Sequence, residues 1–313
     1  MKRTLLAAAL TLLGASSAFA QSAVNVYGRL NTTVERQKSG TDDPVWHLQN
    51  NASRIGFRGN EDLGGGLKAG FIIEHGFNPD TGAQTQSRFW ARQSEVFVGA
   101  TAGTLRLGNF TSEAYYATAD FISMHNHDTG TSADALYAYL GRDTNKVAYR
   151  SPLFGGFYAD AAVSLAEGAA PNRTMDLALN GAVGPVQLGA GYQKDGNANQ
   201  YAIRGLYEIG SFTVGAYVQR DKDGFASGNG SRTTLRLSAM YTLGSSEFHL
   251  NFGRAGDYSN VANSKANQAT VGYNYNLSKR TKVYGFYTKL NDSVAGVYGG
   301  DFSSFAVGMR HNF

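Results

Sequence analysis

The sequence predicts an all-β protein, a sixteen-stranded antiparallel barrel that crosses a membrane. The final segment, 305–313, alternates apolar with small or polar side chains and ends on an aromatic residue. Similar period-two runs recur along the chain, and 39 glycines with only five prolines suit strands joined by tight turns. Every backbone N–H and C=O must be paired within the protein in hydrocarbon, so strands span a bilayer only as a closed barrel.

Sixteen segments have the alternation or length of a strand, an even number, as in bacterial single-chain barrels. The predicted strands are 24–36, 46–60, 67–78, 87–100, 104–110, 143–150, 156–166, 174–183, 186–194, 200–209, 211–220, 232–242, 247–255, 267–277, 281–291 and 303–313. Short connections near 184–185 and 243–246 contrast with longer polar ones near 221–231 and 256–266. This contrast is typical of short periplasmic turns and long external loops.

The segment 174–183 shows the alternation plainly. Met175, Leu177 and Leu179 are apolar, whereas the residues between them are polar or small. An apolar face and a polar face fit lipid outside and water inside better than a packed soluble core. A soluble β-sandwich remains the structural alternative.

The N-terminus predicts secretion. Lys2 and Arg3 precede a short apolar stretch at 5–13, and Ala18, Phe19 and Ala20 form a small-x-small cleavage site. We therefore expect a signal peptide at 1–20, a single barrel domain at 21–313, and an integral location in the bacterial outer membrane. The chain has no cysteine, so neither a disulfide nor a thiolate metal site is expected.

Basic residues share one face of the predicted strands. If Ile55 and Phe57 face lipid, Arg54 and Arg58 face inward. The same parity gives a predicted basic wall of Arg29, Arg54, Arg58, Arg92 and Arg142. Arginine stays charged at physiological pH, and its fork of donors suits carboxylates and phosphates. Glu74 also falls on the inward parity. For each arginine the alternative is an ion pair that only stabilises the wall.

The longest connection is acidic. Between Arg106 and Arg142 the chain contains no lysine or arginine, but it holds Glu113, Asp120, Asp128 and Asp134. A solvated surface loop is one interpretation, and a loop that faces the basic wall is the other.

Six blocks in order resemble the general trimeric porins of β-proteobacteria. They are VYGRL at 26–30, SRIGFRGNEDLGGGLKA at 53–69, VFVG at 96–99, SPLFGGF at 151–157, LSKRT at 277–281 and VGMRHNF at 307–313. The resemblance implies a trimeric barrel whose third external loop folds into the pore, with passive diffusion of small hydrophilic solutes and a preference for anions. It favours the loop that faces the basic wall, so Asp120, Asp128 and Asp134 are the candidate acidic groups of the constriction loop, and which of the three reaches the pore stays open. Glu74, placed inward by parity, is the acidic group expected within the basic wall.

The same resemblance implies partners and an assembly signal. The expected partners are further copies of the chain in a homotrimer, outer-membrane lipid and lipopolysaccharide, and small hydrophilic or anionic solutes, with no nucleic acid. Phe313 is the expected assembly signal. Asn31 and Asn109 depart from the family pattern, since an acid and an arginine respectively are common at those positions.

Two other function classes remain alternatives. His125, His127 and Asp128 lie close together near Ser123 and Ser132, and such a group can begin a metal or hydrolytic site, but it lacks further ligands. We therefore expect no enzyme activity. A structural or adhesive barrel with a closed lumen is the second alternative, although inward glycines at 189, 191, 215 and 272 predict a roomy interior. No Walker or dinucleotide motif is present, so no cofactor is expected.

Overall fold

A computed structural model describes residues 24–122, 130–141, 143–168, 173–292 and 297–313. The strands are β1 (Val24–Ser39), β2 (Val45–Asn50), β3 (Arg54–Gly64), β4 (Leu67–Gly76), β5 (Gln93–Ala100), β6 (Gly103–Asn109), β7 (Lys146–Arg150), β8 (Phe157–Ser164), β9 (Thr174–Val183), β10 (Val186–Asp195), β11 (Ala198–Ile209), β12 (Phe212–Lys222), β13 (Ser231–Leu243), β14 (Ser246–Ala255), β15 (Ala266–Asn276), β16 (Thr281–Asp292) and β17 (Phe302–Asn312). The helices are α2 (Glu113–Ala117) and α3 (Ala119–Ile122). Within these residues no helix has the length and apolar character needed to cross a membrane.

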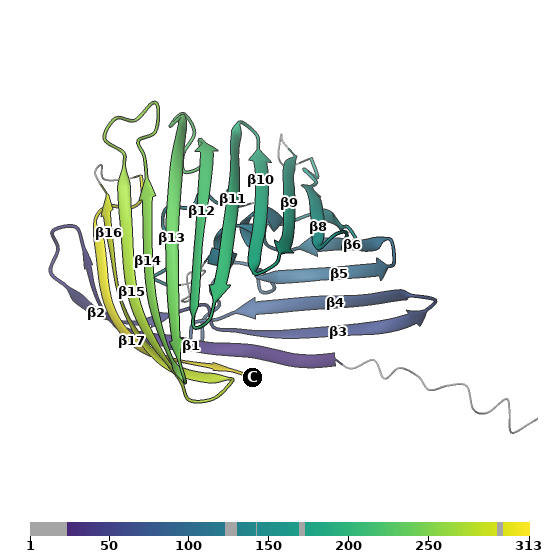
Figure 1. The fold of residues 1–313 in the computed structure, drawn as a ribbon, viewed down its shortest axis with the longest axis horizontal. Helices are drawn as coiled ribbons and strands as arrows, with labels where there is room; N and C mark the ends of the chain where they lie inside the picture. The colour runs from purple at the N-terminus through teal and green to yellow at the C-terminus, as the bar shows by residue number, and fades with distance from the viewer. Residues whose placement is uncertain (1–23, 123–129, 142, 169–172, 293–296) are drawn as a thin grey trace, which may run out of the picture.

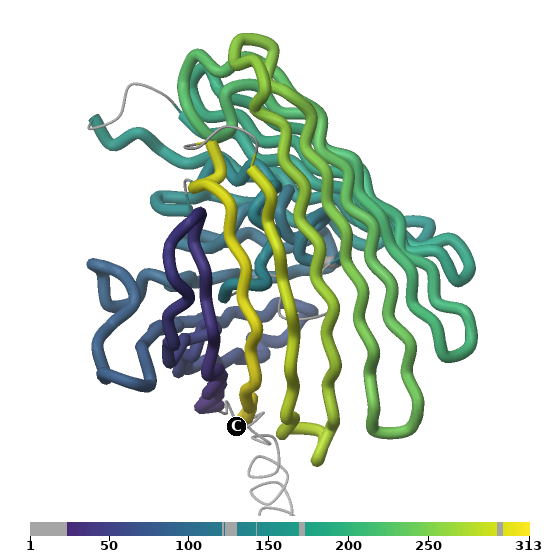
Figure 2. Tube along the Cα trace, turned by 90° about the vertical axis from the view of Figure 1, so that its left-hand side faces the viewer, coloured from purple at the N-terminus to yellow at the C-terminus, as the bar shows by residue number. Residues whose placement is uncertain are grey.

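The strands form one closed antiparallel sheet in which, from β3 onward, each strand pairs with the next one in sequence (Figure 1). β1 pairs with β17 along one edge and with both β2 and β3 along the other. Figure 2 shows the purple first strand beside the yellow last strand. Because β2 and β3 share one place in the sheet, the barrel has sixteen strand positions, and the predicted fold class is confirmed.

The last residue takes part in the closure. The Gly28 amide donates to the carbonyl of Phe313 at 3.0 Å, and the Phe313 amide donates to the carbonyl of Gly28 at 3.1 Å. The Phe313 ring occupies the space that a Cβ on residue 28 would need, so glycine there lets the terminal aromatic ring lie across β1. Phe313 therefore joins the two ends of the sheet.

The two faces of the wall have opposite character. On β9, Met175, Leu177 and Leu179 are 48, 42 and 45% exposed, whereas Asp176 between them is 2% exposed. The same alternation of exposed apolar and buried polar residues recurs on β11, β13 and β14. Apolar side chains therefore face outward toward lipid, and polar side chains face the interior, as the sequence predicted.

The predicted strand at 46–60 is wrong as a continuous element, because the structure divides it into β2 and β3. Ala52 takes a positive φ of 58°, which interrupts the extended chain. Polar contacts hold the break: the Asn31 amide nitrogen donates to Ser53 Oγ at 3.0 Å, and the Asn31 side chain donates to the Asn51 carbonyl at 2.9 Å. The apolar residues change parity across the break, from Trp46 and Leu48 to Ile55 and Phe57, so the sequence carries a signal of the break that the single predicted strand passes over.

Three predicted strand boundaries also need correction. The prediction at 87–100 starts too early, since β5 begins at Gln93, and the prediction at 67–78 continues two residues past the end of β4. In the connection between these strands, Phe89 stacks on His75 with ring centroids 3.9 Å apart, so aromatic packing replaces strand pairing. The prediction at 143–150 starts three residues before β7 does.

The long connection between β6 and β7 lies against the inward face of the barrel. Its helix α2 contacts β8, β9, β10 and β11, and α3 contacts β11 and β12. Ile122 of α3 is fully buried and packs with Leu206 and Tyr217, which face inward from β11 and β12. The apolar residues that cover the inner wall here belong to the connection, so the interior is not uniformly polar.

Candidate functional site: two walls of the barrel interior

The structure brings four of the predicted arginines together. Arg29 of β1 and Arg54 of β3 are direct cross-strand partners, Arg58 is four residues further along β3, and Arg92 lies just before β5. Arg58 is exposed and lies over the Tyr27 ring at 4.9 Å. We call Arg29, Arg54, Arg58 and Arg92 the basic wall.

Glu74 of β4 lies within the basic wall, as its parity predicted. Its two oxygens contact Arg92 Nε at 2.7 Å and Arg54 Nε at 3.3 Å. The two arginine side chains are 24 and 25% exposed, but the Glu74 side chain is only 9% exposed. One carboxylate therefore orders two guanidinium groups and neutralises them only in part. A polar cavity of about 440 Å³ opens beside Arg92 and is also lined by Arg88 and Asp143.

The strands β5 to β9 and the helix α2 carry a second set of charges, which we call the paired wall: Glu95, Arg106, Glu113, Lys146, Arg150, Asp160 and Asp176. Arg106 contacts Glu95 at 2.7 Å and Glu113 at 2.5 Å. Arg150 contacts Asp160 at 2.7 Å, and Lys146 contacts Asp176 at 3.3 Å. Every basic side chain of the paired wall has a carboxylate partner.

Helix α2 is seated on the paired wall. The two oxygens of Asp176 accept hydrogen bonds from the backbone amides of Glu113 and Ala114, at 2.8 and 2.9 Å. Ser112 Oγ accepts from the Tyr115 amide at 3.2 Å, so the first turn of the helix has partners for its amides. Burial raises the pKa of the Glu113 carboxyl, and the neighbouring Arg106 opposes that shift.

Inward-facing glutamines hold the later part of the connection, 133–140. Gln219 of β12 binds both the amide and the carbonyl of Ala138, at 2.8 and 3.0 Å. Gln268 of β15 accepts from the Ala135 amide at 3.0 Å and donates to the Ala133 carbonyl at 2.8 Å. An amide side chain offers a donor and an acceptor together, so it can bind the backbone N–H and C=O groups of a segment that has no neighbouring strand.

The structure places Asp134 against the wall. Its carboxylate contacts Arg236 Nε of β13 at 2.8 Å, accepts a hydrogen bond from the Tyr217 hydroxyl, and caps the Leu136 amide at 2.9 Å. The Arg236 and Asp134 side chains are 1 and 6% exposed. Asp134 therefore acts first as an anchor of the connection.

Other predicted positions are less well defined by the structure. Asp120 is half-buried on α3. Arg142 and Asp128 lie outside the described residues, as do His125 and His127 of the possible hydrolytic group and the proposed signal peptide at 1–20. Within the described residues, no group of three or more histidine, aspartate and glutamate side chains could hold a metal ion.

The expectation that inward glycines leave the interior roomy is wrong for three positions. A Cβ on Gly191 would lie 2.7 Å from Ala114 Cα, and one on Gly189 would collide with the Ala117 carbonyl. A Cβ on Gly215 would lie 2.8 Å from Ile122 Cδ1. These glycines make room for the close approach of α2 and α3.

Sequence reasoning missed several basic residues that face inward. Arg106, Arg150 and Lys146 all have the inward parity of their strands, and the acidic residues on neighbouring strands were the available signal. Lys282 of β16 and Arg310 of β17 are cross-strand partners on the inward face, next to Asn31 of β1. The alternation of the sequence could have shown that Lys282 and Arg310 face inward. Only the pairing of β17 with β1 shows that they lie near Arg29.

The comparisons with known proteins agree with this arrangement. A sequence model described as Gram-negative porin matches residues 4–295. The chain belongs to this porin family.

Two relatives cover the chain throughout. Outer membrane porin protein 32 of Delftia acidovorans is 31% identical over the whole of both chains, and an outer membrane porin protein of Bordetella pertussis is 27% identical over the same extent. This porin is therefore an integral outer-membrane protein, and the predicted family and location are confirmed.

Solved structures agree in fold. The anion-selective porin from Comamonas acidovorans matches with a TM-score of 0.79 and 27% identity, over 94% of this chain and 100% of that one. The trimer form of OmpT from Vibrio cholerae matches with a TM-score of 0.71 at 15% identity, over 93 and 99% of the two chains, and supports the fold alone. The porin forms an outer-membrane channel.

Proposed function

We propose that this porin is a water-filled channel for passive diffusion of small hydrophilic solutes and that it prefers anions. The observation that carries the proposal is the basic wall, where one carboxylate, Glu74, pairs with Arg54 and Arg92, while Arg29 is the cross-strand partner of Arg54 and Arg58 is exposed. A row of partly exposed guanidinium groups raises the local concentration of anions without a tight site that would slow transit. The similarity to a porin described as anion-selective supports the same preference.

The connection between β6 and β7 is the proposed constriction. It contacts inward residues from β8 to β15, and at 131 it also reaches β1, where Thr131 Oγ1 donates to Glu35 at 2.7 Å. A segment held at both sides of the barrel narrows the passage and brings solutes close to the wall. Asp120, Asp128 and Asp134 are the proposed acidic groups of this constriction, with Asp134 largely neutralised by Arg236.

The test is the reversal potential of the refolded porin in a planar bilayer under a KCl gradient. A potential that favours chloride supports the basic wall as the selectivity element. A potential that favours potassium would contradict the proposed preference, and the acidic groups of the connection and Glu74 would then dominate the passage.

A barrel with a closed lumen is the second candidate, since the connection fills part of the interior. Liposomes that contain the porin should swell in an isosmotic sugar solution if the lumen is open. An absence of both swelling and conductance would favour the structural or adhesive interpretation.

The named relatives are channel proteins, and we include in the proposal that this porin is no enzyme.

The proposal extends to processing and assembly. Residues 1–20 act as a signal peptide and 21–313 form the mature barrel, which assembles as a homotrimer. The homotrimer follows from the sequence resemblance to the general trimeric porins of β-proteobacteria. Outer-membrane lipid and lipopolysaccharide are the surrounding partners.

Deleting Phe313 should reduce the surface level of the porin, because this residue pairs with Gly28 at the closure. Normal surface levels of the truncated chain would contradict its role as an assembly signal.

A further inference from the structure

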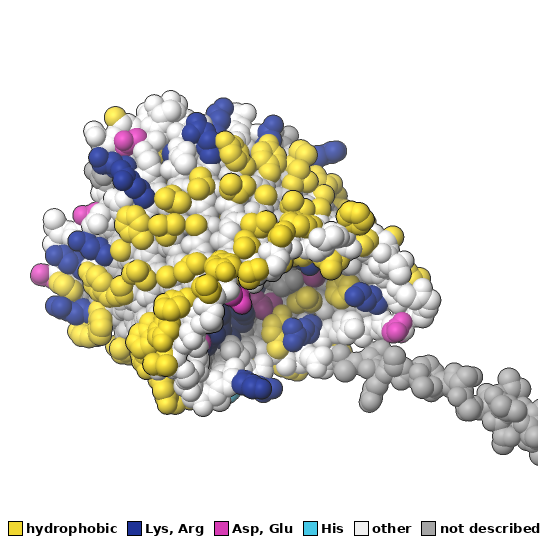
Figure 3. All heavy atoms as spheres, viewed as in Figure 1, with side chains coloured by type: hydrophobic (Ala, Val, Ile, Leu, Met, Phe, Trp, Pro, Cys, Tyr) yellow, Lys and Arg dark blue, Asp and Glu magenta, His cyan; other side chains and the backbone are white. Residues whose placement is uncertain are grey.

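The charges that point outward from the described strands are segregated by sign. Basic side chains lie at the ends that adjoin the longer connections, and Figure 3 shows lysine and arginine along the upper edge of one face, beyond the apolar band. We call them the basic rim: Arg36, Lys38, Arg173, Lys194, Arg220, Lys222, Arg254 and Lys289. The outward acid Glu61 lies at the opposite end, near the short turn after β3.

Exposed acids such as Asp42, Glu167 and Asp257 lie in the connections beside the basic rim, but no ion pair joins them to it among the described residues. None of its members forms an ion pair there, although most basic side chains of the two interior walls are paired. Lys194 and Arg173 flank Met175 on the outer face, and Arg220 and Lys222 lie two residues apart on β12. Exposed like charges repel one another, so this arrangement favours anions supplied from outside the chain.

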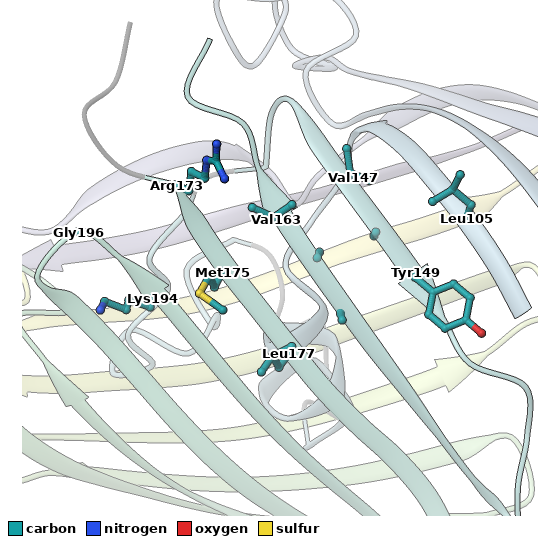
Figure 4. Close-up of a pocket in the computed structure, with 12 residues that line it drawn as sticks. Leu105, Val147, Tyr149, Val163, Arg173, Met175, Leu177, Lys194 and Gly196 are labelled. Carbon is teal, nitrogen blue, oxygen red and sulfur yellow. The ribbon is translucent and has the colours of Figure 1, made fainter. Parts of the chain in front are cut away.

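An apolar groove of about 770 Å³ runs down the outer wall from two members of the basic rim. Arg173 and Lys194 lie at one end, and Val147, Tyr149, Val163, Met175 and Leu177 line its sides (Figure 4). The strand register explains the groove. Ala161 of β8 is paired with Tyr149 on one side and Leu177 on the other, so a small side chain forms a floor between two large ones.

We propose that this groove binds a phosphorylated, multiply acylated glycolipid of the outer leaflet. One acyl chain lies along the groove, and a phosphate group lies between Arg173 and Lys194. The proposal rests on the outer-membrane location, in which the longer connections face outside. It does not depend on ion selectivity.

The order of chemistry along the wall favours this occupant. A lipid in the bilayer places its phosphate at the interface and its acyl chain toward the midplane, which is the order of the basic pair and the apolar groove. A second copy of the chain fits less well, because two basic rims of the same sign would meet. Guanidinium and ammonium groups also suit phosphate better than an uncharged headgroup.

The test compares two lipids and two pairs of variants. Refolded porin in detergent is titrated with bisphosphorylated lipid A and with the same lipid lacking phosphates, and bound lipid is counted by native mass spectrometry. R173Q/K194Q should bind the phosphorylated lipid about tenfold more weakly than wild type, since each basic group near a lipid phosphate contributes to affinity. The matched control K279Q/R280Q removes two exposed charges from the short turn after β15 and should bind normally.

A second variant tests the groove itself. A161L fills the floor and should weaken binding of both lipids, whereas A269L, on the outer face of β15, should not. Equal binding of the two lipids by the wild type, or unchanged binding by R173Q/K194Q, would overturn the proposal. Conductance is measured on the same samples. An R173Q/K194Q variant that still conducts but no longer binds the phosphorylated lipid supports the lipid-binding proposal. Lipid binding by a wild type that does not conduct would count against the channel function alone.

Discussion

The basic wall and the paired wall use the same residue type for different purposes. In the basic wall, Glu74 serves two arginines, and Arg58 remains exposed with an aromatic ring as its neighbour. In the paired wall, Arg106 has two carboxylates and Arg150 has Asp160 and Glu113. In the proposed channel, we therefore expect an inward arginine to contribute to selectivity only where its neighbours leave its charge partly unmatched.

The difference also explains where the long connection is attached. It is seated on the paired wall and on β12 to β15, where carboxylates and glutamines offer partners to its backbone. The basic wall offers mainly donors, which cannot satisfy backbone amides. Water and mobile anions are better partners for those arginines, so we expect the passage of the proposed channel on that side.

The largest expected effect comes from breaking the buried ion pair between Arg236 and Asp134, which anchors the long connection. Replacing Arg236 by alanine leaves Asp134 buried without its partner, and such a loss costs about 3–5 kcal/mol of stability. We expect R236A to lower the midpoint of denaturant-induced unfolding in micelles, with a smaller loss in D134N/R236M, which removes both charges. The exposed R280A serves as the control. A midpoint equal to that of the wild type in R236A would show that the contact does not anchor the connection.

A reciprocal change in the basic wall should affect selectivity, and it should also lower stability because Glu74, whose side chain is 9% exposed, loses both of its arginine partners. R54S/R92S removes two partly exposed charges, and a unit charge at about 4 Å in water changes ion affinity by about threefold to tenfold. The chloride-to-potassium permeability ratio should fall by that order, and E74Q should raise it. The ratio is measured by reversal potential, with K279S/R280S as the charge-matched control. If the control shifts the ratio as much, the wall is not the selective element.

A side chain that pushes α2 away from the paired wall and toward the basic wall should narrow the passage between them. Valine at position 191 would collide with Ala114, and overpacking of this kind costs about 1–3 kcal/mol unless the helix moves. We expect G191V to lower single-channel conductance as α2 moves toward the basic wall. G205A on β11 is the control, because no atom lies within 4 Å of the added Cβ. Conductance that is unchanged in G191V would place the passage away from α2.

The smallest expected effect is on pH dependence. Burial raises the pKa of Glu113, so this carboxyl gains a proton at a higher pH than an ordinary glutamate as the solution is acidified. Neutral Glu113 leaves Arg106 and Arg150 less compensated, so anion preference should rise as pH falls, by about twofold or less because salt screens the charge. E113Q should flatten this change in reversal potential. A pH response that persists in E113Q would assign it to another carboxyl.

The sequence determined the barrel, its faces and the parity of its charges. A period of two decides which side chains face lipid, so the alternation alone places Arg54, Arg58 and Glu74 on the inward face. The change of parity between Leu48 and Ile55 marks the break at Ala52 in the sequence. The late start of β5 was not predictable, because the contact between Phe89 and His75 competes there with strand pairing.

Only the tertiary structure decided what each inward charge does. Parity gives a direction but no distance, and the partners of Arg106 and Arg236 include residues of the long connection, whose path across the interior no strand pattern predicts. The same holds for Gly189 and Gly191, whose missing side chains have meaning only because α2 lies against them. An interaction energy depends on separation and on solvent exposure, and closure of the barrel fixes both.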